Sequence, residues 1–209
     1  MAVTLLNNSL DAHGCWQLFG NVNSVLDSIT YIGINSESKA CWLVDCGDPA
    51  PVLDFLDGYE IDHIFLTHIH FDHIYGLNEV LKKYSHLEAH TNSAGIIALY
   101  DDRKNMSRYH GYPFTCDYPD NVYCTDNNNI IPIDNNLSAL AVPTPGHNPS
   151  SLTWIIGNAL FTGDSFIPGM KTVSSLPGGN RKLAADSEVL IKQLSGDKII
   201  YPGHKISET

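Results

Sequence analysis

Three histidines and an aspartate crowd into the short segment from His68 to His73, and so many polar side chains would suit an apolar core poorly. Neutral imidazole and carboxylate are usual protein ligands of divalent metal ions in hydrolytic sites. Further along the chain, a ligand-type side chain directly follows a glycine shortly after an apolar strand at three places. The sequence therefore predicts a metal site, and the side chains with suitable chemistry are His68, His70, Asp72, His73, His147, Asp164 and His204.

Strand-like segments precede these side chains and must position them. The apolar segment 61–67 runs straight into the histidine cluster, and Asp45 follows the apolar segment 41–44 in the same manner. Turns rich in glycine and proline connect the later strands to the three later candidates. Side chains at strand ends are held rigidly and face a common edge of a sheet. We therefore expect a mononuclear or dinuclear site at one edge of a sheet.

Alternating strands and helices are predicted over most of the chain, within a single domain that spans residues 1–209. Periodicity is weak between residues 100 and 129, and a long irregular segment inside a compact domain predicts a functional insertion, here a lid that faces the substrate. Expected strands cover 28–34, 40–45, 61–67, 87–90, 137–142, 152–156, 159–162 and 198–201, and expected helices cover 51–56, 72–84, 92–99 and 184–194.

Charge and composition exclude several classes of function. The 209 residues include 23 acidic and 12 basic side chains, a formal charge of −11, so the basic footprint of a nucleic-acid-binding protein is missing. The apolar runs fall far short of a membrane span, and the N-terminus lacks the basic start of a signal peptide. The five cysteines are odd in number and lack zinc-ribbon spacing, so reduced thiols are expected. We expect a cytoplasmic protein that binds neither nucleic acid nor membranes.

With these motifs in order from Asp45 to His204, the sequence resembles the metallo-β-lactamase-fold hydrolases. The resemblance implies an α/β fold, a four-layer αββα sandwich, and two divalent metal ions, with zinc expected and iron or manganese as alternatives. It implies that Asp45 supports the histidine loop through hydrogen bonds. It also assigns His68, His70 and His147 to one metal and Asp72, His73 and His204 to the other, with Asp164 bridging both.

Two such metals can share a hydroxide and lower the pKa of bound water from about 15.7 toward about 7, and Asp72 would orient this nucleophile as the catalytic carboxylate. Aspartate at position 164, where the commonest true β-lactamases carry cysteine, points away from antibiotic hydrolysis. The Gly-His, Gly-Asp and Gly-His motifs look most similar to the glyoxalase II branch, which hydrolyses glutathione thioesters. The resemblance thus implies a hydrolase acting on a small thioester.

Three other functions stay open. A persulfide dioxygenase shares these motifs but uses one iron, held by the equivalents of His68, His147 and Asp164. A lactonase or a small-molecule phosphodiesterase would use nearly the same hydroxide chemistry. A degenerate member of the family would keep the fold as a non-catalytic binding module. Isolated histidines, namely His13, His63, His86 and His90, are expected to be ordinary surface or core residues.

Substrate contacts are expected from two segments. The sequence ends five residues after His204, so the helical domain that helps longer glyoxalase II enzymes to bind glutathione has no counterpart in it. Basic side chains after Asp164 would then recognise the glutathione carboxylates, unless they are solvated loop charges. Aromatic residues of the segment 100–129 would form an apolar lid, or else anchor the loop or a homodimer contact. The candidates are Lys171, Arg181 and Lys182 for the charges, Met106, Tyr109, Tyr112 and Phe114 for the lid, and Tyr109 or His110 for a proton or oxyanion contact.

Overall fold

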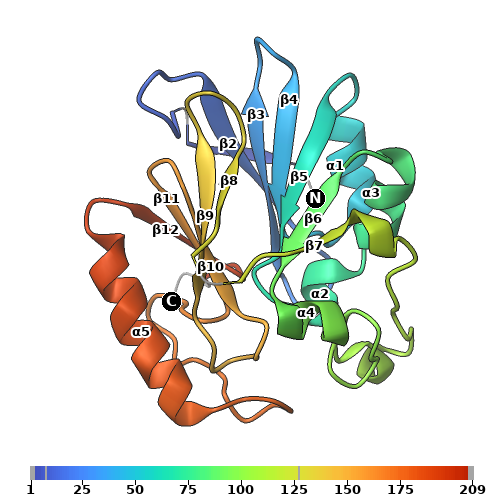
Figure 1. Cartoon of the computed structure of the whole chain (residues 1–209), viewed down its shortest axis with the longest axis vertical. Helices are drawn as coiled ribbons and strands as arrows, with labels where there is room; N and C mark the ends of the chain where they lie inside the picture. The colour runs from blue at the N-terminus through green and yellow to red at the C-terminus, as the bar shows by residue number, and fades with distance from the viewer. Residues whose placement is uncertain (1–2, 8, 127, 207–209) are drawn as a thin grey trace.

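Two β-sheets lie face to face in the computed structural model, which describes residues 3–7, 9–126 and 128–206 (Figure 1). The seven-stranded sheet has the order β1-β2-β3-β4-β5-β6-β7, and the five-stranded sheet has the order β12-β11-β10-β9-β8. The first sheet consists of β1 (Thr4–Asn7), β2 (Trp16–Val22), β3 (Ile29–Asn35), β4 (Ala40–Val44), β5 (Glu60–Phe65), β6 (Glu88–Thr91) and β7 (Val122–Cys124). The second consists of β8 (Ile130–Pro132), β9 (Ser138–Pro143), β10 (Leu152–Ile156), β11 (Ala159–Gly163) and β12 (Ile199–Pro202).

Helices cover the outer faces of both sheets. On the first sheet lie α1 (Pro49–Phe55), α2 (Phe71–Ile74), α3 (Leu77–Lys83) and α4 (Ser93–Ala98), whereas α5 (Arg181–Ser195) flanks the second sheet (Figure 1). Two 3-10 helices, η1 (Ser107–His110) and η2 (Pro119–Asn121), interrupt the loop between α4 and β7. The predicted four-layer αββα sandwich is confirmed. No helix in the described part of the chain is both long and apolar enough to cross a membrane.

Strand β4 is apolar on both faces because each face packs against a core. In β4, Trp42 and Val44 face the second sheet, whereas Cys41 and Leu43 face the helices. Strands β4, β5, β6 and β7 pair in parallel, the arrangement in which both faces of a sheet are normally covered. The carboxyl ends of these strands therefore meet at one edge of the sandwich.

Two details of the sequence-based fold need correction. The helix predicted over 72–84 is two short helices, because the amide of Gly76 donates to the carbonyl of Cys46 at 3.0 Å and a Cβ there would lie 2.0 Å from the Gly47 oxygen. Strands β1, β2, β7 and β8 were not predicted. These strands are short or mix polar with apolar residues, and they form because each pairs with a neighbouring strand. Strand β7 lies within the segment 100–129 and pairs in parallel with β6.

Candidate metal centre

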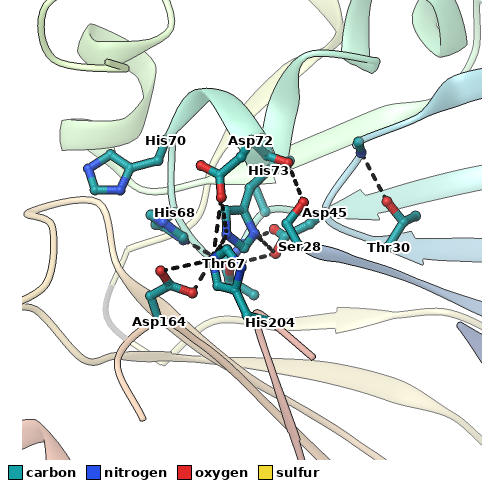
Figure 2. A network of polar contacts seen from close by, with 12 residues as sticks. Ser28, Thr30, Asp45, Thr67, His68, His70, Asp72, His73, Asp164 and His204 are labelled. Atoms are coloured by element: carbon teal, nitrogen blue, oxygen red, sulfur yellow. Dashed lines mark hydrogen bonds and ion pairs between the residues drawn. The ribbon is translucent and has the colours of Figure 1, made fainter. Parts of the chain in front are cut away.

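The predicted ligands come together at the edge where the strands end (Figure 2). The loop after β5 and the start of α2 carry the histidine cluster, and His147 lies in the loop between β9 and β10. Asp164 directly follows β11, and His204 follows β12 after Gly203; these strands pair in parallel, so their ends lie side by side. Gly203 permits this approach, since a Cβ at that position would lie 2.3 Å from a carboxylate oxygen of Asp164.

Three buried histidines, His68, His70 and His147, form the first group. Nδ1 of His70 lies 2.9 Å from Nε2 of His147, and Nε2 of buried His68 has no hydrogen-bond partner. Nδ1 of His147 bonds to the carbonyl of Val173 at 2.7 Å, which leaves Nε2 as its free lone pair. Burial, reinforced by the neighbouring histidines, lowers the pKa of His68 well below its usual value and that of His70 to about 3. Three neutral rings whose nitrogens lie close together form a group that could hold a metal ion.

Asp72, His73 and His204 form the second group. Oδ2 of Asp72 lies 3.3 Å from Nε2 of His73 and 3.3 Å from Nε2 of His204, and the two Nε2 atoms are themselves 3.3 Å apart. Ligand atoms at about 2.0–2.1 Å from a tetrahedral zinc ion would be separated by about 3.4 Å. The Nδ1 of His204 bonds to the carbonyl of Leu26 at 2.8 Å and orients that ring. This group has the spacing of one coordination sphere.

Asp164 lies between the two groups. Its Oδ2 is 3.5 Å from Nε2 of His147 and 3.3 Å from Nε2 of His204, while Oδ1 is 3.6 Å from Nε2 of His73. Burial acts to raise the pKa of Asp164, but the surrounding His204, His73 and His147 hold it well below its usual range. Its Oδ1 has no hydrogen-bond partner although it is buried. A charged carboxylate with one unsatisfied oxygen is therefore in contact with both groups.

Asp45 supports the loop that carries the histidine cluster through hydrogen bonds to Thr67 and His73. Its carboxylate accepts hydrogen bonds from the amide and the hydroxyl of Thr67, both at 2.7 Å, and from Nδ1 of His73 at 2.8 Å. Asp45 itself has φ +59°, a left-handed conformation that turns the chain at the end of β4. Burial acts to lower the pKa of His73, but Asp72 and Asp45 raise it well above its usual value. This arrangement fixes the proton on Nδ1 and leaves Nε2 facing the centre.

One polar contact was not predicted from the sequence. The side-chain amide of Asn148 lies 2.9 Å from Nε2 of His70, on the ring edge away from His147. Its Oδ1 accepts from the amide and the hydroxyl of Ser150, so the amide group is oriented. The position of Asn148 directly after a candidate ligand was the signal available in the sequence.

The residues predicted to touch substrate differ in their surroundings. His110 stacks on Phe71, with ring centroids 5.0 Å apart, and Phe71 lies between His70 and Asp72 in the sequence. Phe114 is buried in the core between the first sheet and its helices, which favours the alternative that it anchors the loop. Four others are exposed and remain predictions: Tyr109, Tyr112, Lys171 and Arg181. The metal-binding role of the seven candidate ligands likewise remains a prediction.

A cavity of about 360 Å³ lies beside the centre and was not predicted. Asn148, which contacts His70, forms part of its wall, so cavity and centre are neighbours. The remaining wall is apolar except for two basic side chains, Arg103 and Lys104. The complete lining comprises Ala94, Ile97, Ala98, Arg103, Lys104, Asn148, Pro149, Pro177 and Gly178.

Comparison with known sequences identifies one family and several relatives with a shared name. A family model described as the metallo-beta-lactamase superfamily matches residues 28–204. A hydroxyacylglutathione hydrolase of Buchnera aphidicola is 27% identical over 187 residues, which cover 88% of this chain and 65% of that protein. One from Psychromonas ingrahamii is 27% identical over 145 residues, which cover 68% of this chain and 48% of that protein. The chain thus spans about half to two thirds of the length of these relatives.

Solved structures show the same fold. The B3 metallo-beta-lactamase BLEG-1 superposes with a TM-score of 0.80 and 24% identity, covering 90% of this chain and 92% of that one. The protein TTHA1623, solved in a di-iron-bound form, superposes with a TM-score of 0.76 and 23% identity, covering 91% and 94% of the two chains. At these identities the likeness shows the fold alone.

Proposed function

The chain belongs to the metallo-β-lactamase superfamily, and from that premise we propose that it is a metal-dependent hydrolase of small thioesters, similar in reaction to a hydroxyacylglutathione hydrolase. The position of Asp164 carries the proposal, because its carboxylate contacts both groups of candidate ligands. Curated relatives named hydroxyacylglutathione hydrolase support the thioester as substrate.

The residues fit two divalent metal ions. Buried Nε2 of His68 and Oδ1 of Asp164 lack any hydrogen-bond partner, which is costly unless another group satisfies them. His68, His70 and His147 would hold one ion, Asp72, His73 and His204 the other, and Asp164 would bind both. When bound there, the ions would make a water molecule acidic enough to attack at neutral pH and would polarise the carbonyl of the ester.

Asp72 is the best-placed general base. Burial acts to raise the pKa of Asp72, but His73 and His204 lower it, so the carboxylate is ionised at neutral pH. Its Oδ2 faces both histidines, so with the second ion bound Asp72 would orient the attacking hydroxide, and with that site empty its ionised carboxylate would accept the proton of the attacking water. Asp45 keeps His73 in place through Nδ1 while this occurs.

The thiolate leaving group of a thioester needs little assistance from the protein. A thiolate leaves without prior protonation, so the centre needs no strong general acid, and none of the described candidate ligands is placed as one. The cavity beside Asn148 offers an apolar wall for the carbon chain of a substrate, with Arg103 and Lys104 for an anionic group. Among the side chains expected to touch substrate, His110 has the best support, because it stacks on Phe71 next to the centre. Roles for Tyr109, Tyr112, Lys171 and Arg181 are part of the proposal.

A substrate panel tests the reaction. Chelated protein is reloaded with zinc, iron or manganese and assayed with a glutathione thioester, a lactone, a phosphodiester and a β-lactam. We expect the thioester to be hydrolysed with the highest kcat/KM, and Asp72→Asn to lower kcat by about 10²–10⁴-fold. A higher kcat/KM for another substrate would replace the thioester in the proposal. Oxygen uptake with glutathione persulfide, at a rate above thioester hydrolysis, would replace hydrolysis by an iron-dependent oxidation.

A further inference from the structure

A second set of metal-ligand side chains lies inside the first sheet, away from the centre described above. His63 belongs to β5, and Glu88 and His90 belong to the adjacent parallel strand β6, where His63 and Glu88 are register partners. All three point toward the second sheet, because residues two apart share a face and Phe65 packs against Trp154 of that sheet. None of the three is among the predicted ligands of the candidate centre.

The ligand atoms of this trio are spaced as a single coordination sphere would require. Nδ1 of His63 lies 3.1 Å from Nε2 of His90, and Oε2 of Glu88 lies 3.7 Å from the first and 3.5 Å from the second. Tetrahedral zinc with ligand bonds of about 2.0–2.1 Å requires separations of about 3.4 Å. The two rings therefore turn a nitrogen each toward the point that the carboxylate also faces.

Both rings are held rigidly and are neutral. Phe65 stacks against the two imidazoles, with centroids 5.7 Å from His63 and 5.4 Å from His90, and Tyr123 of β7 lies 5.9 Å from His90. Burial lowers the pKa of both histidines, that of His90 to about 3. Neutral imidazole is the form that binds metal. The side chain of Glu88 is 38% exposed, against 14% for His63 and 5% for His90, so the trio opens to solvent on the carboxylate side.

We propose that His63, Glu88 and His90 bind a divalent transition-metal ion of the zinc type, at a site separate from the candidate hydrolytic centre. Two imidazoles and one carboxylate leave one position of a tetrahedral sphere for a water molecule. The ion links β5 to β6, and its binding stabilises the pairing of these strands. Mixed nitrogen and oxygen ligands favour zinc, copper or nickel over magnesium or calcium. No sequence pattern groups these residues, because His63 and His90 lie 27 positions apart.

Metal stoichiometry tests the proposal on the full chain. Chelated wild type, His63→Gln and Glu88→Gln are dialysed against zinc, and the bound metal is counted by elemental analysis. We expect each variant to bind one equivalent fewer than wild type. His86→Gln is the matched control, since His86 is a half-exposed histidine near Glu60 and Asp62 on the same sheet edge and should bind as many equivalents as wild type. Equal stoichiometry in wild type, His63→Gln and Glu88→Gln would overturn the proposal, as would an equal loss in His86→Gln.

Two features keep this test independent of the hydrolase. The expected loss is a difference of one equivalent, so it is read in the same way whether the candidate centre holds two ions, one or none. Cobalt supplies a second measurement: His68→Gln should remove cobalt absorption from the candidate centre only, and His63→Gln should remove the tetrahedral bands of the new site only. If His63→Gln fails to fold, Glu88→Gln, at a more exposed position, gives the same comparison. Cobalt spectra of wild type and Glu88→Gln that coincide would contradict a metal at this trio.

Discussion

At the scale of single residues, Asp45 orients the histidine cluster although it is not itself a candidate ligand. Three hydrogen bonds end on its two oxygens, two from Thr67 and one from His73. They fix the backbone just before His68 and the tautomer of a ring that faces the centre. The left-handed backbone conformation at Asp45 turns the chain where its carboxylate contacts Thr67 and His73. The precision of the histidine cluster is therefore set by a residue outside it.

Replacing Asp45 with asparagine tests this dependence. An amide NH₂ would face donors from Thr67 or His73, so at least one buried hydrogen bond is lost. We expect a loss of about 1–3 kcal/mol in the free energy of unfolding and a fall of about 10–100-fold in metal affinity. Urea denaturation and zinc titration measure the two effects. Asp54→Asn, on the exposed face of α1, makes the same chemical change and should alter neither. Unchanged zinc affinity in Asp45→Asn would show that the loop does not need this carboxylate.

The candidate ligands could be predicted from sequence because their chemistry is explicit in the residue types and because each follows an apolar strand. Asn148 could not, since an asparagine after a turn is common, and only the fold shows that its amide lies against His70. The same holds for Phe114, whose aromatic character fits a lid and a core equally well, and which the structure buries in the core. Residue type predicts the chemistry of a side chain better than it predicts its environment.

At the scale of elements, the turn before His147 depends on its contact with α5. Gly146 has φ +135°, and a Cβ on it would lie 2.2 Å from the backbone nitrogen of Ala184 in the first turns of α5. Further along the helix, the hydroxyl of Ser187 donates to the carbonyl of Pro145 at 2.7 Å. The helix thus packs directly on the turn that presents a candidate ligand.

Gly146→Ala should therefore disturb both the helix and the centre. Close contact with backbone atoms and an unfavourable φ together should lower the free energy of unfolding by about 2–4 kcal/mol. Gly169→Ala is the control for backbone strain alone, because Gly169 has φ +79° and no atom within 4 Å of the place that a Cβ would take, so it should cost about 1–2 kcal/mol. Thermal unfolding separates the two variants, and zinc content reports on His147. A similar loss in the free energy of unfolding in both variants would mean that α5 shifts at little cost to make room for the added Cβ.

Helix α4 and the loop after it line the cavity. The two basic side chains of that loop lead to a prediction about the charge of the substrate. Changing Arg103 and Lys104 together to glutamine should raise KM for an anionic thioester about 3–10-fold and leave kcat unaltered, since partly exposed charge contacts contribute about 0.2–1 kcal/mol each. The matched control is Lys82→Gln with Lys83→Gln at the end of α3, which makes the same change in net charge. Steady-state kinetics at two salt concentrations measures the effect. An equal rise in KM in the control would assign it to overall charge.

Element order and type were largely predictable, whereas element ends and edge strands were not. Strand β4 is a continuous apolar run followed by Asp45, and β5 ends in the apolar pair Ile64 and Phe65, patterns that local sequence carries by itself. The break between α2 and α3 depends instead on the contact of Gly76 with residues 46 and 47, which no local pattern reveals. The short strand β7 depends in the same way on β6, its partner in the sheet.

At the scale of the whole molecule, the candidate centre joins the two halves of the sandwich. The histidine cluster belongs to the first sheet, whereas His147, Asp164 and His204 follow strands of the second. Figure 2 shows Asp164 and His204 facing His68, Asp72 and His73. Hydrogen bonds already connect the sheets beside it, from the indole of Trp154 to the carbonyl of Leu66 and from the amide of Leu152 to that of Thr67. Metal ions held by ligands from both sheets would resist their separation, which is part of unfolding.

Metal removal should therefore lower the stability of the whole domain. A ligand present at about 100 times its Kd stabilises the folded state by about 2.7 kcal/mol, and about 2–4 °C of Tm accompanies each kcal/mol in a domain of this size, so chelation should lower Tm by about 5–10 °C. The measurement is best made in His63→Gln, where the proposed site between β5 and β6 cannot contribute. His204→Gln in the same background removes one contact between the sheets and should lose most of the response to zinc. If Tm in His63→Gln does not respond to zinc, the sheets are held by their apolar core and hydrogen bonds without help from a metal ion, and the side chains at this edge do not add to stability by binding zinc.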